Sequence, residues 1–242
     1  MVQSRLISSL LAPALRLWLR SQVESIEALT LDIEGGDRQI LSGHIPGVVL
    51  EAQQAIYQGL HLSQLAMTAS TIRINIGQVI RGKALKLLAP IPVDTTVFLD
   101  ARGLELSASA PLLMDALTEL WQTLGQVAPE LVDGANSQGT PTLHCGDGYL
   151  DIRLDIQAQN SDKSLATSTH HLSSVTLRTG LTILDGHVLQ FSQPHLHSVG
   201  DEPRQLSALE GFQIDLGRDV ILQTLTLQSE GIRCEGNILV MP

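Results

Sequence analysis

The first patterned segment of the chain runs from Leu6 to Leu19, where apolar residues recur at helical spacing. On a helical wheel, one broad arc holds Leu6, Ile7, Leu10, Leu11, Ala14, Leu15, Leu17 and Trp18. The opposite arc holds Arg5, Ser9, Arg16 and Arg20. The pattern predicts an amphipathic helix, with Pro13 either in the first turn of its main part or at a kink.

This helix has two interpretations. An apolar face opposite arginines, in a chain that is otherwise acidic, is typical of a helix lying in a membrane interface. A helix that packs its apolar face on a protein core shows the same pattern, and in globular proteins packing is the more common cause. Both interpretations remain open from the sequence.

A period of two begins at Leu29, where Leu29, Leu31 and Ile33 alternate with polar residues. The Gly35-Gly36-Asp37 turn that follows predicts a half-buried antiparallel hairpin. The same alternation predicts further strands at Leu60–Leu65, Ile72–Ile76 and Val93–Leu106.

A second amphipathic helix is predicted to begin near Ser109 and Pro111. One arc of it carries Leu113, Met114, Leu117, Leu120, Trp121, Leu124 and Val127. The other arc carries Asp115, Thr118, Glu119, Gln122 and Gln126. We therefore expect this helix to lay an aliphatic stripe across the concave face of a sheet.

The remaining segments are again predicted to be strands separated by turns. A turn-rich connection at 133–142 and a polar loop at 157–168 flank a strand at Tyr149–Ile156. Later strands are predicted at Val175–Leu184, His187–Phe191, Val220–Leu227 and Ile232–Val240, the first two forming a hairpin through Asp185-Gly186. The order predicts an α+β fold with a mainly antiparallel sheet. We expect one domain over 1–242, with a helix in 1–27, strands in 28–106, a helix in 107–128 and strands in 141–242.

Amino-acid composition excludes several classes of function. With 43% apolar residues the chain can bury a full core, while its net charge of −10 and seven aromatic residues argue against nucleic-acid binding. Cys145 and Cys234 lie in no CxxC motif, so neither a disulfide framework nor a zinc site is indicated, although one isolated disulfide remains open. The apolar stretch at 6–19 is too interrupted to span a bilayer, and no cleavage site follows it, so we expect a cytoplasmic protein.

The motifs that carry chemistry are weak. Gly77–Ala84 approaches a P-loop, but Ala84 stands where Ser or Thr must bind magnesium. Its Arg81, together with Lys83 and Lys86, forms a basic cluster that either meets headgroup phosphates or is merely solvated. His195 and His197 share a strand face without a third ligand, while the adjacent His144 and Cys145 face opposite ways. We expect neither enzymatic activity nor a metal or cofactor.

Several segments resemble the cyanobacterial branch of the LmeA-like phospholipid-binding family, first classified as a domain of unknown function. They are Leu11–Glu24, Glu34–Gly43, Ile56–Leu62, Phe212–Val220, Gly231–Gly236 and the final Val240-Met-Pro. The resemblance implies a fold similar to the tubular lipid-binding (TULIP) domains, a curved antiparallel half-barrel that wraps a helix and leaves an apolar groove for acyl chains. Each buried lipid methylene contributes about 0.8 kcal/mol, so such a groove needs no polar motif.

The leading hypothesis is therefore a lipid-binding protein that is peripheral to a membrane, with a phospholipid or another acyl lipid as partner. The expected lipid-binding residues are Leu10, Leu11, Leu15, Trp18, Leu113, Leu117, Leu120, Trp121 and Leu124. Those of the second helix are expected to line the groove, whereas the first helix either plugs one end of the groove or docks on the bilayer through Leu10, Leu11 and Trp18. Those expected at headgroups or the membrane surface are Arg5, Arg16, Arg20, Arg81, Lys83 and Lys86. The alternative is a membrane-peripheral scaffold or assembly factor that binds a protein partner, with its interior filled by side chains.

Overall fold

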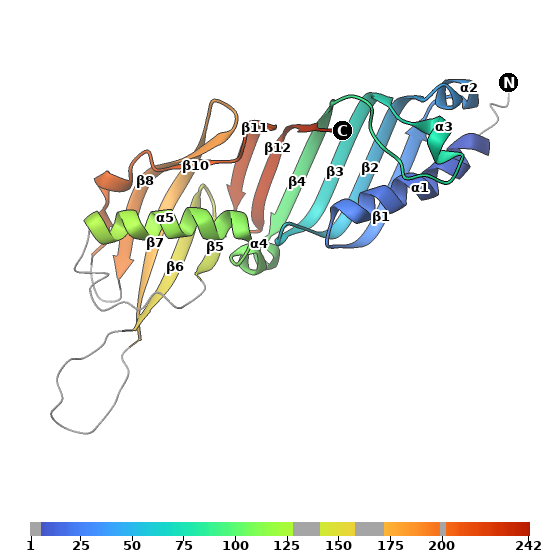
Figure 1. Ribbon diagram of the computed structural model, residues 1–242. Coiled ribbons are helices and arrows are strands. Elements are labelled where there is room, and N and C mark those ends of the chain that lie inside the picture. The colour runs from blue at the N-terminus through green and yellow to red at the C-terminus, as the bar shows by residue number, and fades with distance from the viewer. Residues whose placement is uncertain (1–5, 128–140, 158–171, 199–201) are drawn as a thin grey trace.

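The computed structural model describes residues 6–127, 141–157, 172–198 and 202–242 (Figure 1). The fold is α+β, as the sequence predicts, with two curved antiparallel sheets and two long helices on the same side of them. The predicted connection at 133–142 and the polar loop at 157–168 lie largely outside the described residues.

The first sheet has the strand order β1-β2-β3-β4-β12-β11. Its strands are β1 (Ser25–Glu34), β2 (His44–Tyr57), β3 (Leu60–Arg73), β4 (Ile91–Asp100), β11 (Val220–Gln228) and β12 (Gly231–Val240). Every neighbouring pair in it is antiparallel. The last two strands of the chain thus complete a sheet that its first strands begin, which confirms the predicted strands at 220–227 and 232–240.

The second sheet has the order β10-β8-β7-β6-β5, with β9 paired to β8. Its strands are β5 (Thr142–Gly146), β6 (Tyr149–Gln157), β7 (Leu172–Leu184), β8 (Val188–Ser198), β9 (Arg204–Gln205) and β10 (Gln213–Asp215). The predicted hairpin is confirmed, because Leu184 faces Val188 across the Asp185-Gly186 turn. Gly186 has a φ of +77°, a conformation that a residue without a Cβ adopts at little cost.

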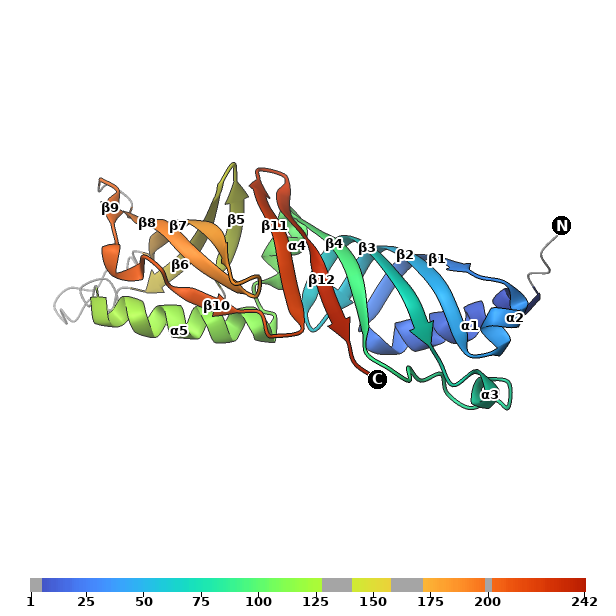
Figure 2. The ribbon, with the colours of Figure 1, turned by 90° about the horizontal axis from the view of Figure 1, so that it is seen from above.

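Two 17-residue helices lie against these sheets. Helix α1 (Leu6–Gln22) packs on the first sheet and α5 (Pro111–Val127) on the second (Figures 1 and 2). The remaining helices are short: α2 (Asp37–Leu41), α3 (Ile76–Val79), α4 (Ala101–Ser107) and the 3₁₀ turn η1 (Ser207–Leu209). Each long helix therefore covers the antiparallel strands that follow it in the chain.

Hairpin turns of the second sheet join the edge of the first. The Gly148 N–H donates to the Leu227 carbonyl at 3.0 Å, and the Ser229 N–H donates to Asp147 Oδ1 at 3.0 Å. The Leu222 N–H also donates to the carbonyl of Gly186. The two sheets consequently form one elongated, curved body (Figure 2).

Buried apolar residues form two clusters. We call the cluster between α1 and the first sheet the α1 cluster; it includes Leu11, Leu15, Ile40, Ile45 and Ile74. We call the cluster between α5 and the second sheet the α5 cluster; its members are given with the site below. Both rest on alternating strand residues that face a helix.

Two local predictions need correction. The strand predicted at Val93–Leu106 ends at Asp100, because Asp100 Oδ1 accepts from the Gly103 N–H at 2.6 Å and caps α4. The predicted Gly35-Gly36-Asp37 turn leads into α2, whose Ile40 is fully buried, although β1 and β2 still pair antiparallel.

The separately predicted strands at 60–65 and 72–76 are also different in the structure. A single strand, β3, runs through both segments and ends at Arg73. Residues 74 and 75 follow the strand, and Ile76 already belongs to α3. Pairing with β2 along almost its whole length stabilises β3 as one element, which local alternation alone could not indicate.

Candidate functional site

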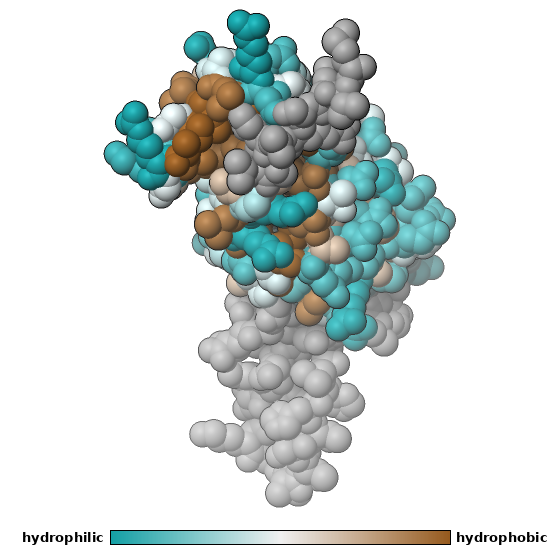
Figure 3. All heavy atoms as spheres, turned by 90° about the vertical axis from the view of Figure 1, so that its right-hand side faces the viewer, coloured by the Kyte–Doolittle hydropathy of each residue, from teal (hydrophilic) through white to brown (hydrophobic). Residues whose placement is uncertain are grey.

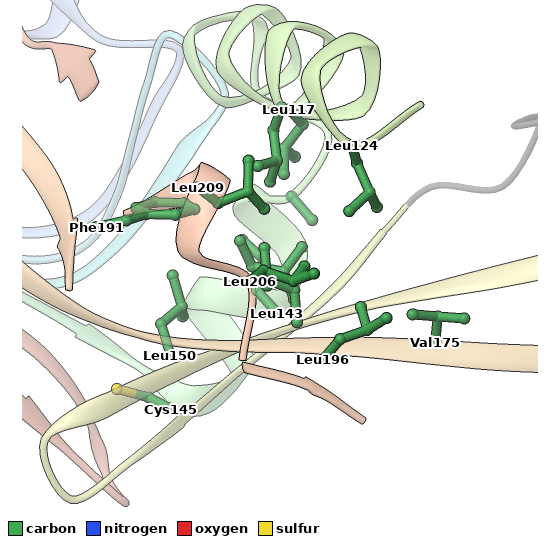
Figure 4. Close-up of a cluster of buried hydrophobic side chains, with 14 of the residues drawn as sticks. Leu117, Leu124, Leu143, Cys145, Leu150, Val175, Phe191, Leu196, Leu206 and Leu209 are labelled. Atoms are coloured by element: carbon green, nitrogen blue, oxygen red, sulfur yellow. The ribbon is translucent and has the colours of Figure 1, made fainter. Parts of the chain in front are cut away.

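The aliphatic stripe of α5 faces the second sheet. Leu117, Leu120 and Leu124 are 8%, 2% and 1% exposed, and in Figure 4 Leu117 and Leu124 point from the helix toward the strands. Leu113 and Trp121 pack against the same cluster but are only partly buried, so they lie at its margin. The 3.6-residue period thus identifies the buried centre of this face of α5, whereas Met114 and Val127, predicted on the same arc, are 40% and 36% exposed.

The opposite wall of this layer comes from the second sheet and the segment around η1, where the sequence predicted no lipid-binding residue. It consists of Leu143, Cys145, Leu150, Ile152, Val175, Leu177, Phe191, Leu196, Leu206 and Leu209 (Figure 4). Phe191 also stacks at a tilt on Phe212, with ring centroids 5.1 Å apart. Alternation along β5 to β8 is the signal that could have located the strand residues.

The α5 cluster continues across the junction between the sheets. Leu227 and Ile232 of β11 and β12 are buried members of it, and Leu225 packs against it. Leu104 of α4 is a further buried member. The apolar layer under α5 therefore extends beyond the second sheet to the edge of the first.

The two cysteines belong to this layer as free thiols. Cys145 is fully buried, Cys234 is partly buried, and no disulfide joins them. Burial raises the pKa of the Cys145 thiol and raises the pKa of Cys234 from 9.0 to about 11. Both thiols therefore stay protonated at neutral pH and act as small apolar side chains.

The chemistry of the α5 cluster is that of alkyl and aromatic contact. Its members are apolar side chains and protonated thiols, which hold hydrocarbon by dispersion and by exclusion of water. The face that carries Cys145 excludes the exposed neighbour His144, as the strand alternation predicts. Among the described residues, the layer is thus made of apolar packing contacts, and His144 does not share the face of Cys145.

The lipid-binding residues predicted on α1 belong to the helix that packs on the first sheet. Leu11 and Leu15 are buried against the first sheet, and Trp18 packs beside them. Leu10 belongs to α1, but its side chain lies outside the described ones. Leu17, predicted on the same apolar arc, is 72% exposed, because the helix turns Leu11, Leu15 and Leu19 toward the sheet. In this arrangement α1 uses its apolar face for packing.

The basic residues predicted at lipid headgroups belong to two segments, α1 and the connection after α3. Arg16 and Arg20 are exposed on the outer side of α1, whereas Arg5 lies outside the described residues. Arg81, Lys83 and Lys86 are exposed on the connection that follows α3. This connection is not a phosphate-binding loop followed by a long helix, since α3 spans only Ile76–Val79 and precedes the basic residues.

Two hollows in the described surface are lined mainly by polar residues. One of about 410 Å³ lies beside α4 and is lined by Glu27, Gln54, His61, Asp100, Arg102, Gly103 and Leu106. The other, of about 230 Å³, is lined mainly by polar residues of β3, β4, β11 and β12. His195 and His197 flank the buried Leu196 on the outer face of β8, and the described part of the chain contains no group of three or more metal-ligating side chains.

Comparison with known proteins gives one finding. A family model described as LmeA-like phospholipid-binding matches residues 2–237, which is nearly the whole chain of 242 residues. No curated protein and no solved structure matches the chain significantly. Within the described ranges, none of the helices has the length and hydrophobicity needed to cross a bilayer. On the family match, the chain belongs to the LmeA-like phospholipid-binding family.

Proposed function

We propose that the protein binds a phospholipid, or another acyl lipid, with its acyl chains held in an apolar groove between α5 and the second sheet. The observation that carries the proposal is the continuous aliphatic layer under α5, in a chain of a phospholipid-binding family. The lipid leaves chemically unchanged, so the protein acts in lipid transfer or membrane lipid homeostasis rather than in catalysis.

The attachment of α5 supports a groove that opens. Among the described residues, α5 meets the rest of the protein through side chains, while its hydrogen bonds stay within the helix and its first turn. The helix can therefore move outward without breaking a strand pair. Leu113 and Trp121, at the margin of the cluster, then mark where an acyl chain enters. The buried leucines of α5, which are Leu117, Leu120 and Leu124, replace their contacts with the sheet by contacts with lipid methylenes.

In this proposal both sheets act as one lipid-binding domain, because the α5 cluster contains residues from each. Leu11, Leu15 and Trp18 of α1 close the end of the body remote from α5. Arg5, Arg16 and Arg20 face headgroup phosphates when the protein rests on a membrane. In this proposal the protein is cytoplasmic and associates peripherally with the membrane surface.

A second candidate function is a membrane-peripheral scaffold or assembly factor that holds no lipid. The observation that favours it is the closed packing of Leu117, Leu120 and Leu124, together with the mainly polar lining of the two hollows in the described surface. A core already filled by side chains has no volume for an acyl chain.

Mass spectrometry distinguishes the two candidates. The purified protein is extracted with organic solvent for lipid analysis, and native mass spectra of the intact protein count bound ligands. Stoichiometric phospholipid supports the groove. A lipid-free, tightly folded chain that also takes up no lipid from mixed micelles contradicts it and favours the scaffold.

The two tryptophans locate the acyl chain. Trp121 lies at the margin of the α5 cluster and Trp18 at that of the α1 cluster, so W18F and W121F each leave one reporter. A phospholipid with brominated acyl chains should quench Trp121 in the W18F protein and quench Trp18 in W121F much less. Equal quenching of both, or quenching of Trp18 alone, contradicts the proposed position.

A further inference from the structure

The connection between β3 and β4 has an unusual charge composition. No acidic residue occurs between Glu51 and Asp94, although the whole chain carries a net charge of −10. The same stretch contains Arg73 and the three cations that follow α3. It is therefore a local positive region in an acidic protein.

Hydrogen bonds and buried anchors hold this connection in a definite shape. Asn75 Nδ2 donates to the Ala84 carbonyl at 3.0 Å, and Asn75 Oδ1 accepts from the Lys86 N–H at 2.7 Å. The Leu88 N–H donates to the Arg73 carbonyl at 2.9 Å. Ile76, Leu85 and Leu87 are buried members of the α1 cluster. The outward side chains are thus presented from a structured support.

The outward side chains are apolar and cationic. Ile80 is 66% exposed and Leu88 is 59% exposed, and Leu41 on the neighbouring α2 is 49% exposed. Arg81, Lys83 and Lys86 stand between them, and no carboxylate in the described ranges forms an ion pair with these three cations. Figure 3 looks onto this end and shows hydrophobic surface gathered beside strongly hydrophilic side chains on the side where α3 projects.

We propose that residues 76–90, which we call the β3–β4 tip, dock the protein on an anionic lipid bilayer. Ile80 and Leu88 enter the interface between headgroups and acyl chains, and Arg81, Lys83 and Lys86 lie against lipid phosphates. The pattern matches a bilayer because the exposed aliphatic side chains suit the acyl-chain boundary, while the cations beside them suit the headgroup phosphates. This inference goes beyond the proposed function, since it names the membrane surface on which the protein docks.

The charge contribution is tested with lipid vesicles. Full-length protein is sedimented with phosphatidylcholine vesicles, and with vesicles in which about a third of the lipid is phosphatidylglycerol. The triple variant R81Q/K83Q/K86Q should bind the anionic vesicles about a hundredfold more weakly, since each interfacial cation contributes roughly a fivefold factor. Added salt should weaken binding of the unmodified protein.

A matched variant separates local from total charge. R102Q/R218Q/R233Q removes three exposed cations elsewhere and changes the net charge equally. It should keep the affinity of the unmodified protein within about threefold, because these positions lie outside the tip. Equal loss in both triple variants, or no loss in the tip variant, overturns the inference.

The apolar contribution has its own control. I80S/L88S should reduce binding about tenfold or more even when all cations remain, because two aliphatic side chains no longer enter the interface. The control I221S/M241S alters residues of similar exposure, 57% and 56%, on and after the last strands. Circular dichroism and thermal unfolding verify that each variant is folded. Unchanged binding by folded I80S/L88S contradicts docking through the tip.

Lipid content separates this inference from the proposed function. If the unmodified protein carries no lipid but docks through the tip, the inference stands and the groove fails. If it carries lipid while both tip variants bind anionic vesicles normally, the groove stands and the inference fails. If the tip variants lose docking but still load lipid from mixed micelles, both stand.

Discussion

The molecule contains two regions with the same helix-on-sheet architecture, whose apolar clusters are bounded in different ways. In each, a 17-residue amphipathic helix covers the four antiparallel strands that follow it: α1 covers β1 to β4, and α5 covers β5 to β8. The α1 cluster is closed further by residues of α2 and by the β3–β4 tip. The α5 cluster instead continues sideways into β11 and β12 and contains both cysteines and the Phe191–Phe212 pair.

In the two proposals made above, one architectural unit serves two tasks. The region around α1 carries an end surface of exposed apolar and basic residues, which suits contact with a membrane. The region around α5 carries the longer apolar layer, which suits hydrocarbon. The two proposals together therefore assign a docking surface and an acyl-chain layer to one curved body.

The largest effects should come from truncating one buried leucine in each region. L124A and L11A should each lower the free energy of unfolding by about 3 kcal/mol, from lost burial and the cavity left behind. The exposed neighbours Leu112 and Leu17 serve as controls, and L112A and L17A should cost less than about 1 kcal/mol.

Urea unfolding followed by circular dichroism measures these changes. If the two regions are one cooperative domain, both buried substitutions lower the midpoint of the same transition. Two transitions, each sensitive to only one substitution, would contradict the expectation of a single domain over 1–242.

Alkaline pH should weaken the α5 region selectively. The pKa of Cys234 is raised to about 11 from 9.0, so its stabilising contribution is complete below pH 9 and is lost as pH rises through 11. At pH 10 the loss is about 1.4 kcal/mol, since the unfolded chain ionises first. C234A should remove this part of the pH dependence.

Hydrogen exchange as a function of pH provides the regional measurement. Amides of β5 to β8, β11 and β12 should lose protection between pH 9 and 11, while those of β1 and β2 lose less after correction for intrinsic exchange. The pKa of Cys145 is also raised, so C145A/C234A should flatten the pH dependence of exchange further. An unchanged alkaline profile in the double variant would remove the thiols as its cause.

The smallest effect concerns the link between the two regions. Asp100 ends β4 and caps α4, so D100A should cost about 1 kcal/mol of unfolding free energy. D100N is the matched variant, because asparagine caps a helix as well as aspartate does. Thermal unfolding should therefore place D100N near the unmodified protein, and equal loss in both variants would assign the effect to the carboxylate charge instead.

Much of the fold could be predicted from local patterns. The period of 3.6 identified Leu117, Leu120 and Leu124 as one buried face, and the period of two identified the hairpin around Asp185-Gly186. The boundary at Asp100 was missed because the alternation in the sequence continues to Leu106, whereas the side chain of Asp100 caps α4 and begins a helix there. Ile80 and Leu88 were missed because exposure depends on which neighbours cover a residue.

The sequence by itself determined the α+β class, the amphipathic character of both long helices, the resemblance to the lipid-binding family and the basic composition around Lys83. Only the tertiary structure decided that the chain forms two sheets, that α1 turns Leu11 inward and Leu17 outward, and that the α5 cluster reaches β12. The reason is physical. Periodicity records which side chains share a face, whereas the partner of that face is chosen by burial against segments distant in the chain.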